Sequence, residues 1–461
     1  MVKNKFVFFT GKQHKLYRTS TILASFAYTF KEKGYSVNAI KIEPSINSDA
    51  LAHSETYIMD SVSTSFDFGI YERLIGMNLS RKSSIISQSM DNILNKLNES
   101  VDKTKDITLI EISPLIIDPL DIINEYRTMY GFDSVYHIHI DSKVDLELIP
   151  NMMALRSDVK LTKDYNTDIC YLPQSLQSVY SLPYILENQG ATNVVLSYLG
   201  LQPKPSKLKN YGDLFNKIPK RSKVKIGIIG RFVNNKYAYL SVEEALNHAS
   251  LALNKALDII YIEASSINKN NAKDVLKGLS GVILPGGFGN KGLQGLIDAS
   301  EYLRTHNIPT FGICLGMQIE SIEFARNVLH LKDANSMEFT DKTKNPVIDY
   351  CNHDKTPNTG LNDIKLKDNS FIKSIYNKSV IQERHVHIFK LNQKYLPQFT
   401  SSGFVESAHD NKANIVEALE LNNHTFYLGV QYHPECLSRV DKPHPLFISF
   451  LKAAIEKKET K

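Results

Sequence analysis

The stretch PTFGICLGMQIESIEFA, from Pro309 to Ala325, begins as a short apolar strand and continues as a helix. The strand breaks at Gly312, and Cys314 lies on the turn into the helix. A side chain on such a tight turn is exposed, and the backbone N–H groups that follow it point toward whatever it attacks. The stretch therefore predicts an α/β fold with a cysteine nucleophile at the carboxyl end of one strand.

Two further segments supply what a cysteine nucleophile needs. A thiol requires a neighbouring base to react well near neutral pH. In QYHPE, which ends at Glu435, His433 is predicted to be that base and Glu435 to orient the imidazole. Upstream, PGGFG (285–289) follows the apolar run GVIL. Its glycines let the backbone approach a substrate and offer N–H donors to an oxyanion.

Each segment also has an ordinary structural explanation. A single cysteine is most often a small buried apolar residue, and an isolated His-Pro-Glu is most often a loop. However, the order PGGFG, GICLGMQ, HPE along one α/β pattern favours the catalytic interpretation of Cys314.

Length and composition exclude several classes of protein. The chain has 461 residues, enough for two or three domains, with 42% hydrophobic and 22% charged residues. The net charge of +5 is small, and no basic block is interleaved with aromatic residues, so no nucleic-acid partner is predicted. Four widely spaced cysteines without a CxxC argue against a disulfide framework or a cysteine-rich zinc site. No apolar run is long enough for a bilayer and the start is a strand pattern, which predicts no membrane and a cytoplasmic location.

Apolar runs alternate with helical patterns on both sides of a basic, proline-containing segment. Short buried runs separated by amphipathic helices predict parallel sheets covered on both faces. The segment rich in lysine and proline is predicted to be a solvated linker. We therefore expect an N-terminal domain over residues 1–201, a linker over 202–223 and a second α/β domain over 224–456.

The second half resembles the class I glutamine amidotransferase domain, which hydrolyses glutamine to glutamate and ammonia through a cysteine thioester. This resemblance implies that Cys314 is the nucleophile, His433 the base and Glu435 its orienter. It also implies that Gly287 and Leu315 supply the oxyanion N–H groups, and that the substrate is held by further residues, namely Gln318 and Glu338. Glu338 would grip the amino group of glutamine.

The whole chain, from Lys5 to about Ala454, resembles the CTP synthase family. The segments that carry the resemblance are IKIEPSIN (40–47), FDFGIYERL (66–74), IEIS (110–113), SVYSLPYILENQG (178–190), ANSMEF (334–339) and ERH (383–385). That family phosphorylates UTP with ATP and Mg²⁺ and then adds ammonia from glutamine. The resemblance implies a P-loop-like amidoligase (synthetase) domain with a parallel sheet, followed by the amidotransferase domain.

In the synthetase half, the resemblance implies that Lys41 contacts nucleotide phosphates and that Asp67 and Glu111 hold Mg²⁺. Hard cations prefer carboxylate oxygens, and both residues stand at the carboxyl ends of predicted strands, where sites form. Taken singly, the alternatives are a loop carboxylate at Asp67 and a solvated charge at a strand end at Glu111.

The chain also departs from the family at positions that bind phosphate and substrate. The family's phosphate-loop lysine falls on Thr19, and its flanking glycines fall on Arg18 and Ser20. A second family lysine falls on Leu240, and an arginine that pairs with the glutamine α-carboxylate falls on Ile388. Glycine lets backbone N–H groups approach phosphate closely, so we expect no phosphate cradle of the family kind. Segments that bind UTP are missing as well.

Three hypotheses follow: a CTP synthase with a rebuilt nucleotide site, a glutaminase with an inactive synthetase half, or a non-catalytic regulatory or assembly homologue. The complete set of Cys314, His433 and Glu435 argues against the third. The losses at Thr19 and Leu240 argue against the first. The expected ligands are glutamine and, by resemblance, ATP, Mg²⁺ and UTP. We also expect assembly as a homo-oligomer or with a homologue.

Overall fold

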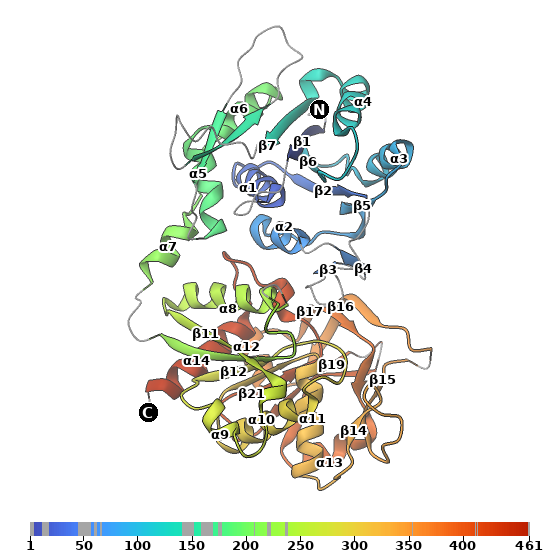
Figure 1. Ribbon diagram of the computed structural model, residues 1–461, viewed down its shortest axis with the longest axis vertical. Coiled ribbons are helices and arrows are strands. Elements are labelled where there is room, and N and C mark those ends of the chain that lie inside the picture. The colour runs from blue at the N-terminus through green and yellow to red at the C-terminus, as the bar shows by residue number, and fades with distance from the viewer. Residues whose placement is uncertain are drawn as a thin grey trace. The chain divides into compact units, whose positions relative to one another are not determined.

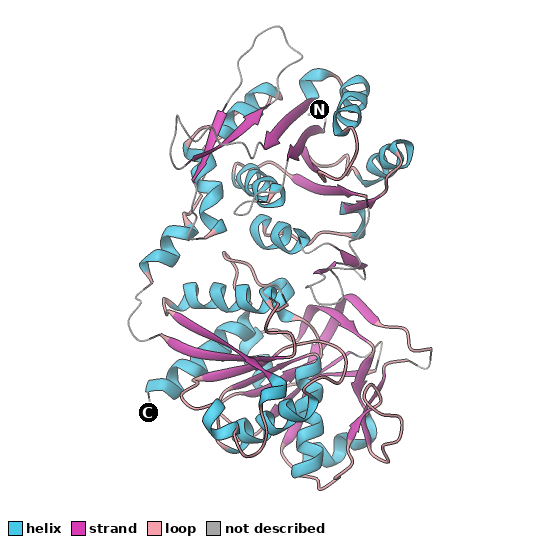
Figure 2. Cartoon of the chain, in the orientation of Figure 1, coloured by secondary structure: helices cyan, strands magenta, loops and turns pink. Residues whose placement is uncertain are grey.

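The computed structural model describes residues 4–11, 18–44, 57–59, 62–64, 67–140, 152–157, 169–173, 178–206, 208–218, 223–235, 238–352, 354–410, 412 and 414–459 (Figure 1). The chain divides into two units, one formed by Met1–Leu51 with Val62–Lys217 and the other by Ala52–Ser61 with Ile218–Lys461. Both units combine helices and strands (Figure 2), so the predicted α/β class is confirmed.

The described part of the first unit is built on one sheet, whose strand order is β5-β2-β6-β1-β7-β8-β9. The five strands from β5 to β7 are parallel, and β8 and β9 continue the sheet antiparallel. The strands are β1 (Lys5–Gly11), β2 (Val37–Glu43), β5 (Ser84–Ile86), β6 (Ile107–Ile112), β7 (Val135–Ile140), β8 (Met152–Ser157) and β9 (Ile169–Pro173). Two short strands, β3 (Tyr57–Met59) and β4 (Val62–Thr64), lie outside this sheet.

Helices cover both faces of the parallel strands, as the uninterrupted apolar runs predict. Phe6 and Phe8 of β1 belong to a buried cluster with the apolar residues of α3 and α4, whereas Phe9 contacts Phe26 of α1. This alternation places α1 on the face opposite α3 and α4. The helices are α1 (Thr19–Glu32), α2 (Asp67–Ile75), α3 (Met90–Ser100), α4 (Pro119–Tyr130), α5 (Leu182–Asn188), α6 (Ala191–Tyr198) and α7 (Tyr211–Lys217).

The second unit contains a larger mixed sheet of order β11-β10-β12-β13-β21-β20-β19-β16-β17. Strands β11 to β21 are parallel, and the remaining neighbours pair antiparallel. Its strands are β10 (Val224–Gly230), β11 (Leu257–Glu263), β12 (Gly281–Leu284), β13 (Thr310–Ile313), β16 (Asn358–Leu366), β17 (Val380–His387), β19 (Phe404–Asp410), β20 (Ile415–Leu421) and β21 (Tyr427–Val430). A small sheet joins β14 (Asn335–Ser336), β15 (Pro346–Tyr350) and β18 (Phe389–Leu391).

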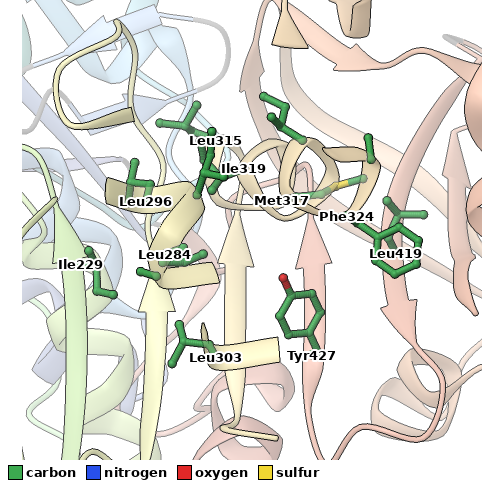
Figure 3. Packing of buried hydrophobic residues seen from close by; sticks show 14 of the residues in the cluster. Ile229, Leu284, Leu296, Leu303, Leu315, Met317, Ile319, Phe324, Leu419 and Tyr427 are labelled. Carbon is green, nitrogen blue, oxygen red and sulfur yellow. The ribbon is translucent and has the colours of Figure 1, made fainter. Parts of the chain in front are cut away.

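Two buried clusters lie on opposite faces of this larger sheet. One packs helices α8 and α14 against the strands, and the other packs α10 and α11. Figure 3 shows the second cluster, in which Leu315, Met317 and Phe324 of α11 lie among residues from α10 and the strands. The helices are α8 (Leu240–Leu253), α9 (Ala272–Val275), α10 (Leu293–Thr305), α11 (Leu315–Asn327), α12 (Phe371–Tyr376), α13 (Leu396–Ser401) and α14 (Pro445–Glu459). This packing fixes α11, whose first residue follows Cys314.

The segment predicted as a linker, 202–223, contains helix α7, and the division between the units falls after Lys217. The exact domain boundaries stay a prediction. Among the described helices, none combines the length and the apolar character needed to span a membrane.

Candidate functional site

Cys314 lies on the turn between β13 and α11, in a backbone conformation with φ of 53°. Such a positive φ is rare for a residue other than glycine and is typical of a nucleophile on a strained strand-to-helix turn. The Cys314 N–H donates to the carbonyl of Val430 on β21 at 2.7 Å, which ties the turn to the sheet. At Gly316, a Cβ would come within 2.0 Å of the Leu284 carbonyl oxygen. Glycine there lets α11 start directly against β12.

His433 and Glu435 follow β21 and lie beside this turn. The His433 Nδ1 and the Glu435 Oε1 are 2.7 Å apart, so the carboxylate fixes the orientation of the imidazole. A Cβ on Gly286 would lie 2.8 Å from the His433 Cε1 and 3.5 Å from the Cys314 Cβ, which places imidazole and thiol at the same glycine. Burial acts to lower the pKa of His433, but Glu435 and Cys314 outweigh it and raise that pKa well above its usual value. The surroundings therefore favour the protonated imidazolium form of His433.

The loop after β12 and the start of α11 form the other side of the site. Leu315 is the first residue of α11, where a helix offers no internal acceptor for the N–H group. Gly287 has a φ of 154°, which favours glycine. Further along the loop, the Gly289 N–H donates to the Glu338 Oε1 at 2.6 Å, and burial raises the pKa of that carboxyl. The structure thus brings the predicted substrate-binding Glu338 to the predicted oxyanion loop.

Two glutamine side chains connect α11 to the cysteine. The Gln318 Nε2 lies 3.3 Å from the Gln431 Oε1, and the Gln431 Nε2 lies 3.7 Å from the Cys314 Sγ. The Gln318 Oε1 is buried and, among the described residues, has no hydrogen-bond partner. Gln431 was not assigned a role from the sequence, although it opens the QYHPE segment. Its amide is well placed to steady the cysteine sulfur.

Arg231 is a second residue that the sequence interpretation missed. It follows β10 directly and is 3% exposed. Its Nη1 donates to the carbonyl of Gly289, and its Nη2 lies beside Gly287, 3.0 Å from where a Cβ would be. Burial lowers the pKa of the guanidinium, although Glu338 opposes that change. The sequence feature that could have identified Arg231 is a cation at the carboxyl end of a buried parallel strand, which is where ligands bind in such sheets.

The two cations nearest to Ile388 in the sequence, Lys390 and Arg384, make other contacts. Ile388 is half-buried and packs on the apolar cluster that contains α11. The Lys390 Nζ donates to the carbonyl of Asn414 at 3.3 Å. Arg384 is buried in β17, and its carbonyl accepts the His433 N–H at 2.8 Å. Arg384 therefore helps to position the base.

Behind the cysteine, His385, His387 and Glu417 have ligand atoms close enough to share a metal ion. Their hydrogen bonds explain the cluster without one. His385 bonds Glu417 Oε2 at 2.9 Å and the Glu383 carbonyl at 3.0 Å, and Glu417 outweighs burial to raise the His385 pKa. His387 bonds the carbonyl of Phe389 at 2.9 Å, and burial lowers its pKa well below the usual value. The surroundings thus shift the pKa values of the two histidines in opposite directions.

In the first unit, Lys41, Asp67 and Glu111 form one buried cluster. Lys41 lies near the end of β2, Asp67 begins α2 and Glu111 lies near the end of β6. The Lys41 Nζ contacts Asp67 closely and lies 3.6 Å from the Glu111 Oε1. Burial opposes ionisation of both acids, but Lys41 and Arg18 lower the pKa of Asp67, whereas burial dominates at Glu111 and raises its pKa.

The arrangement of these carboxylates does not fit a bound Mg²⁺, because every oxygen of the pair already has a donor. Asp67 accepts from Lys41 and from the Arg18 Nη1, the latter at 3.1 Å. Glu111 accepts from the Ser20 hydroxyl at 3.2 Å and from the Tyr71 hydroxyl. Octahedral coordination of Mg²⁺ requires open carboxylate oxygens. Lys12 and Lys15, two lysines of the segment before α1, lie outside the described residues.

In comparisons with known proteins, two family models match different parts of the chain. Residues 236–453 match the family model "Glutamine amidotransferase class-I", and residues 5–110 match "CTP synthase N-terminus". A CTP synthase of Gloeothece citriformis is 31% identical over 98% of this chain and 95% of its own length. This chain belongs to the CTP synthase family.

Other members of the CTP synthase family give the same result. The protein of Bacillus velezensis is 30% identical over 99% of this chain and 100% of its own length, and that of the onion yellows phytoplasma is 32% identical over 100% and 99%. A solved glutaminase domain of Trypanosoma brucei CTP synthase with bound acivicin is 33% identical, covers 51% of this chain and 94% of its own, and has a TM-score of 0.49. Membership of this family makes the chain an enzyme of the glutamine amidotransferase type and implies ATP, Mg²⁺, UTP and glutamine as the family's ligands.

Proposed function

We propose that this chain hydrolyses glutamine at Cys314, and that the family's second step, the ATP-dependent amination of UTP to CTP, is weak or lost in it. The observation that carries the first part is Cys314 on a turn with φ of 53°, with the His433–Glu435 pair beside it. The observation that carries the second is the carboxylate pair, whose oxygens are bonded by the chain itself. The domain boundaries predicted at 201 and 224 are part of this proposal.

The proposed reaction uses the described side chains in two steps. The Cys314 thiolate attacks the side-chain amide carbon of glutamine, and the oxyanion that forms accepts from the N–H groups of Leu315 and Gly287. His433 then gives its proton to the nitrogen, the C–N bond breaks and ammonia leaves. In the second step His433 takes a proton from water, the hydroxide attacks the thioester, and glutamate is released with the proton returned to the sulfur.

Labelling tests the first part directly. A glutamine-analogue electrophile should modify Cys314 alone among the four cysteines, and Cys314→Ala should remove both labelling and glutamate release. The matched control is Cys351→Ala, because burial raises the pKa of Cys351 to about 12 and keeps it an unreactive thiol at neutral pH. Labelling that persists in Cys314→Ala would contradict the assignment.

A second candidate function is full CTP synthesis with a rebuilt nucleotide site. It is favoured by the retained contact of Lys41 with both Asp67 and Glu111. The two candidates separate when purified chain is given ammonium, ATP, UTP and Mg²⁺, which bypasses glutamine hydrolysis. ATP-dependent CTP formation under these conditions would support the rebuilt site. Glutamate release from glutamine without CTP would support the glutaminase, with the retained fold serving assembly with itself or with an active homologue.

A further inference from the structure

Arg231 is a buried cation whose side chain is only partly bonded in the described structure. Its side chain makes a hydrogen bond from Nη1 to the Gly289 carbonyl, while Nη2 is buried and has no hydrogen-bond partner among the described residues. Arg231 also takes part in no ion pair within the described ranges. A buried charge without a counter-ion is strongly unfavourable, so such groups are normally paired or bind a ligand. The guanidinium therefore has an open place for an anion.

The backbone of Arg231 is held firmly, which makes this place pre-formed. Its N–H donates to the Tyr239 hydroxyl at 2.8 Å, and its carbonyl accepts from the Lys291 Nζ at 2.9 Å. Tyr239 fits against the strand because Gly230 has no side chain, since a Cβ there would come within 2.5 Å of the Tyr239 ring. A guanidinium fixed in this way loses little conformational entropy when it binds a ligand.

The loop next to Arg231 carries one charge of each sign. The Gly289 carbonyl accepts from Arg231, and the Gly289 N–H donates to Glu338 at 2.6 Å. A cation and a carboxylate thus bracket the same glycine, on the loop that also contains Gly287. Free glutamine presents both an α-ammonium and an α-carboxylate. A pair of opposite charges bracketing one loop is complementary to such a zwitterion.

We propose that Arg231 binds the α-carboxylate of glutamine, beside Glu338, to which the family resemblance assigns the α-ammonium. This inference rests on the proposed glutaminase function and deepens it. Arg231, which directly follows β10, would thus bind the carboxylate that the family resemblance assigns to position 388. This chain has an isoleucine there, packed on the apolar cluster. Lys390 is not the replacement, since its ammonium bonds the Asn414 carbonyl.

Calorimetry on the full chain carrying Cys314→Ala tests the binding step without turnover. The two ligands are glutamine and 4-aminobutanamide, which is glutamine without its α-carboxylate. Arg231→Gln should weaken glutamine binding roughly ten- to a hundred-fold, the usual effect of losing one charge-assisted partner. It should leave the affinity for 4-aminobutanamide unchanged. Arg231→Lys should recover part of the loss, and Lys390→Gln is the matched control that should change neither affinity.

The outcomes separate a binding role from a merely structural one. Equal weakening of both ligands by Arg231→Gln would mean that the arginine only positions the loop, and would overturn the proposal. Failure of glutamine to bind with Arg231 in place would overturn it too. Ile388→Arg added to Arg231→Gln should restore selectivity for glutamine over 4-aminobutanamide, if both positions face the same carboxylate. Selective glutamine binding through Arg231, with no glutamate release by the unsubstituted chain, would reject the proposed activity and leave this inference standing.

Discussion

Replacing Arg18 by glycine is expected to open the carboxylate pair of the first unit to a divalent cation. Arg18 and Ser20 stand where the family has glycines, and their side chains bond Asp67 at 3.1 Å and Glu111 at 3.2 Å. In Arg18→Gly, one oxygen of Asp67 loses its donor while Lys41 keeps the other. The added Ser20→Gly substitution frees one oxygen of Glu111. Both changes restore the residue type that lets the backbone approach a phosphate.

The size of the effect follows from the exposure of the pair. A hydrogen bond between charged groups contributes about 1.5–3 kcal/mol. The Arg18 side chain is 31% exposed, whereas that of Asp67 is 5% exposed. Solvent therefore screens the Arg18–Asp67 ion pair, and the lower end of this energy range applies. An energy of about 1.4 kcal/mol corresponds to tenfold in affinity. We therefore expect Arg18→Gly to strengthen Mn²⁺ binding about tenfold, and the double variant to strengthen it further.

Electron paramagnetic resonance of free Mn²⁺ measures this affinity without relying on activity. The control is Arg81→Gly, because Arg81 is exposed and makes no salt bridge with Asp67 or Glu111 in the described structure. Equal Mn²⁺ affinity in the unsubstituted chain and in Arg18→Gly would refute the reasoning. So would robust CTP formation by the unsubstituted chain that vanishes in Arg18→Ala, because Arg18 would then act on the nucleotide instead of closing the site.

Two further predictions concern buried acids of the second unit, both measured by thermal unfolding against pH. Burial raises the pKa of Glu320 well above its usual value, and neither oxygen has a partner among the described residues. The folded state therefore holds a proton that the unfolded chain releases near pH 4.3, so stability falls as pH rises above that value. Glu320→Gln should stabilise the chain at pH 8 and change its stability little at pH 4; no gain at pH 8 would contradict this. Glu417→Gln should instead destabilise it by about 3–5 kcal/mol at pH 6, because it removes one partner of a buried pair. Folding raises the pKa of His385, so the His385–Glu417 pair stabilises the fold fully below about pH 6.5. The destabilisation caused by Glu417→Gln should therefore shrink as pH rises through the raised pKa of His385. A destabilisation that grows with pH would argue against a charged His385.

The fold and the proximity of Cys314, His433 and Glu435 could be predicted because their signals in the sequence are local. A strand that breaks into a helix, a glycine-rich loop and His-Pro-Glu each specify a backbone geometry over a few residues. The parallel sheet then brings their ends to one edge, so order along the chain was enough to predict proximity. The roles of these side chains remain predictions, although their placement agrees with them.

Arg231 could not be identified in the same way. Gly289 lies 58 residues from Arg231 and 49 residues from Glu338 in sequence, and both side chains bond it through backbone atoms that carry no residue signature. Only its position after β10 was visible, and many strand ends carry a cation. The cluster of Arg18 with Asp67 was hidden for a similar reason. The sequence showed that glycine was absent at position 18, but the partner of the new side chain depends on how α1 and α2 pack.

The two sites differ in how strongly they are tied to the stability of the fold. At Gly316 a side chain would strike the Leu284 carbonyl at 2.0 Å, so a change there would push α11 off the sheet and damage the core. In contrast, Arg18 and Ser20 add bonds to two buried carboxylates that share Lys41 as a cation, one of which also accepts from the Tyr71 hydroxyl. Two buried acids without enough cations are costly, and an arginine relieves that cost. The replacement of glycine by Arg18 and Ser20 is therefore compatible with a stable fold, whereas a side chain at Gly316 is not. This asymmetry explains how one chain can keep the geometry for glutamine hydrolysis while its other half closes over its own carboxylates.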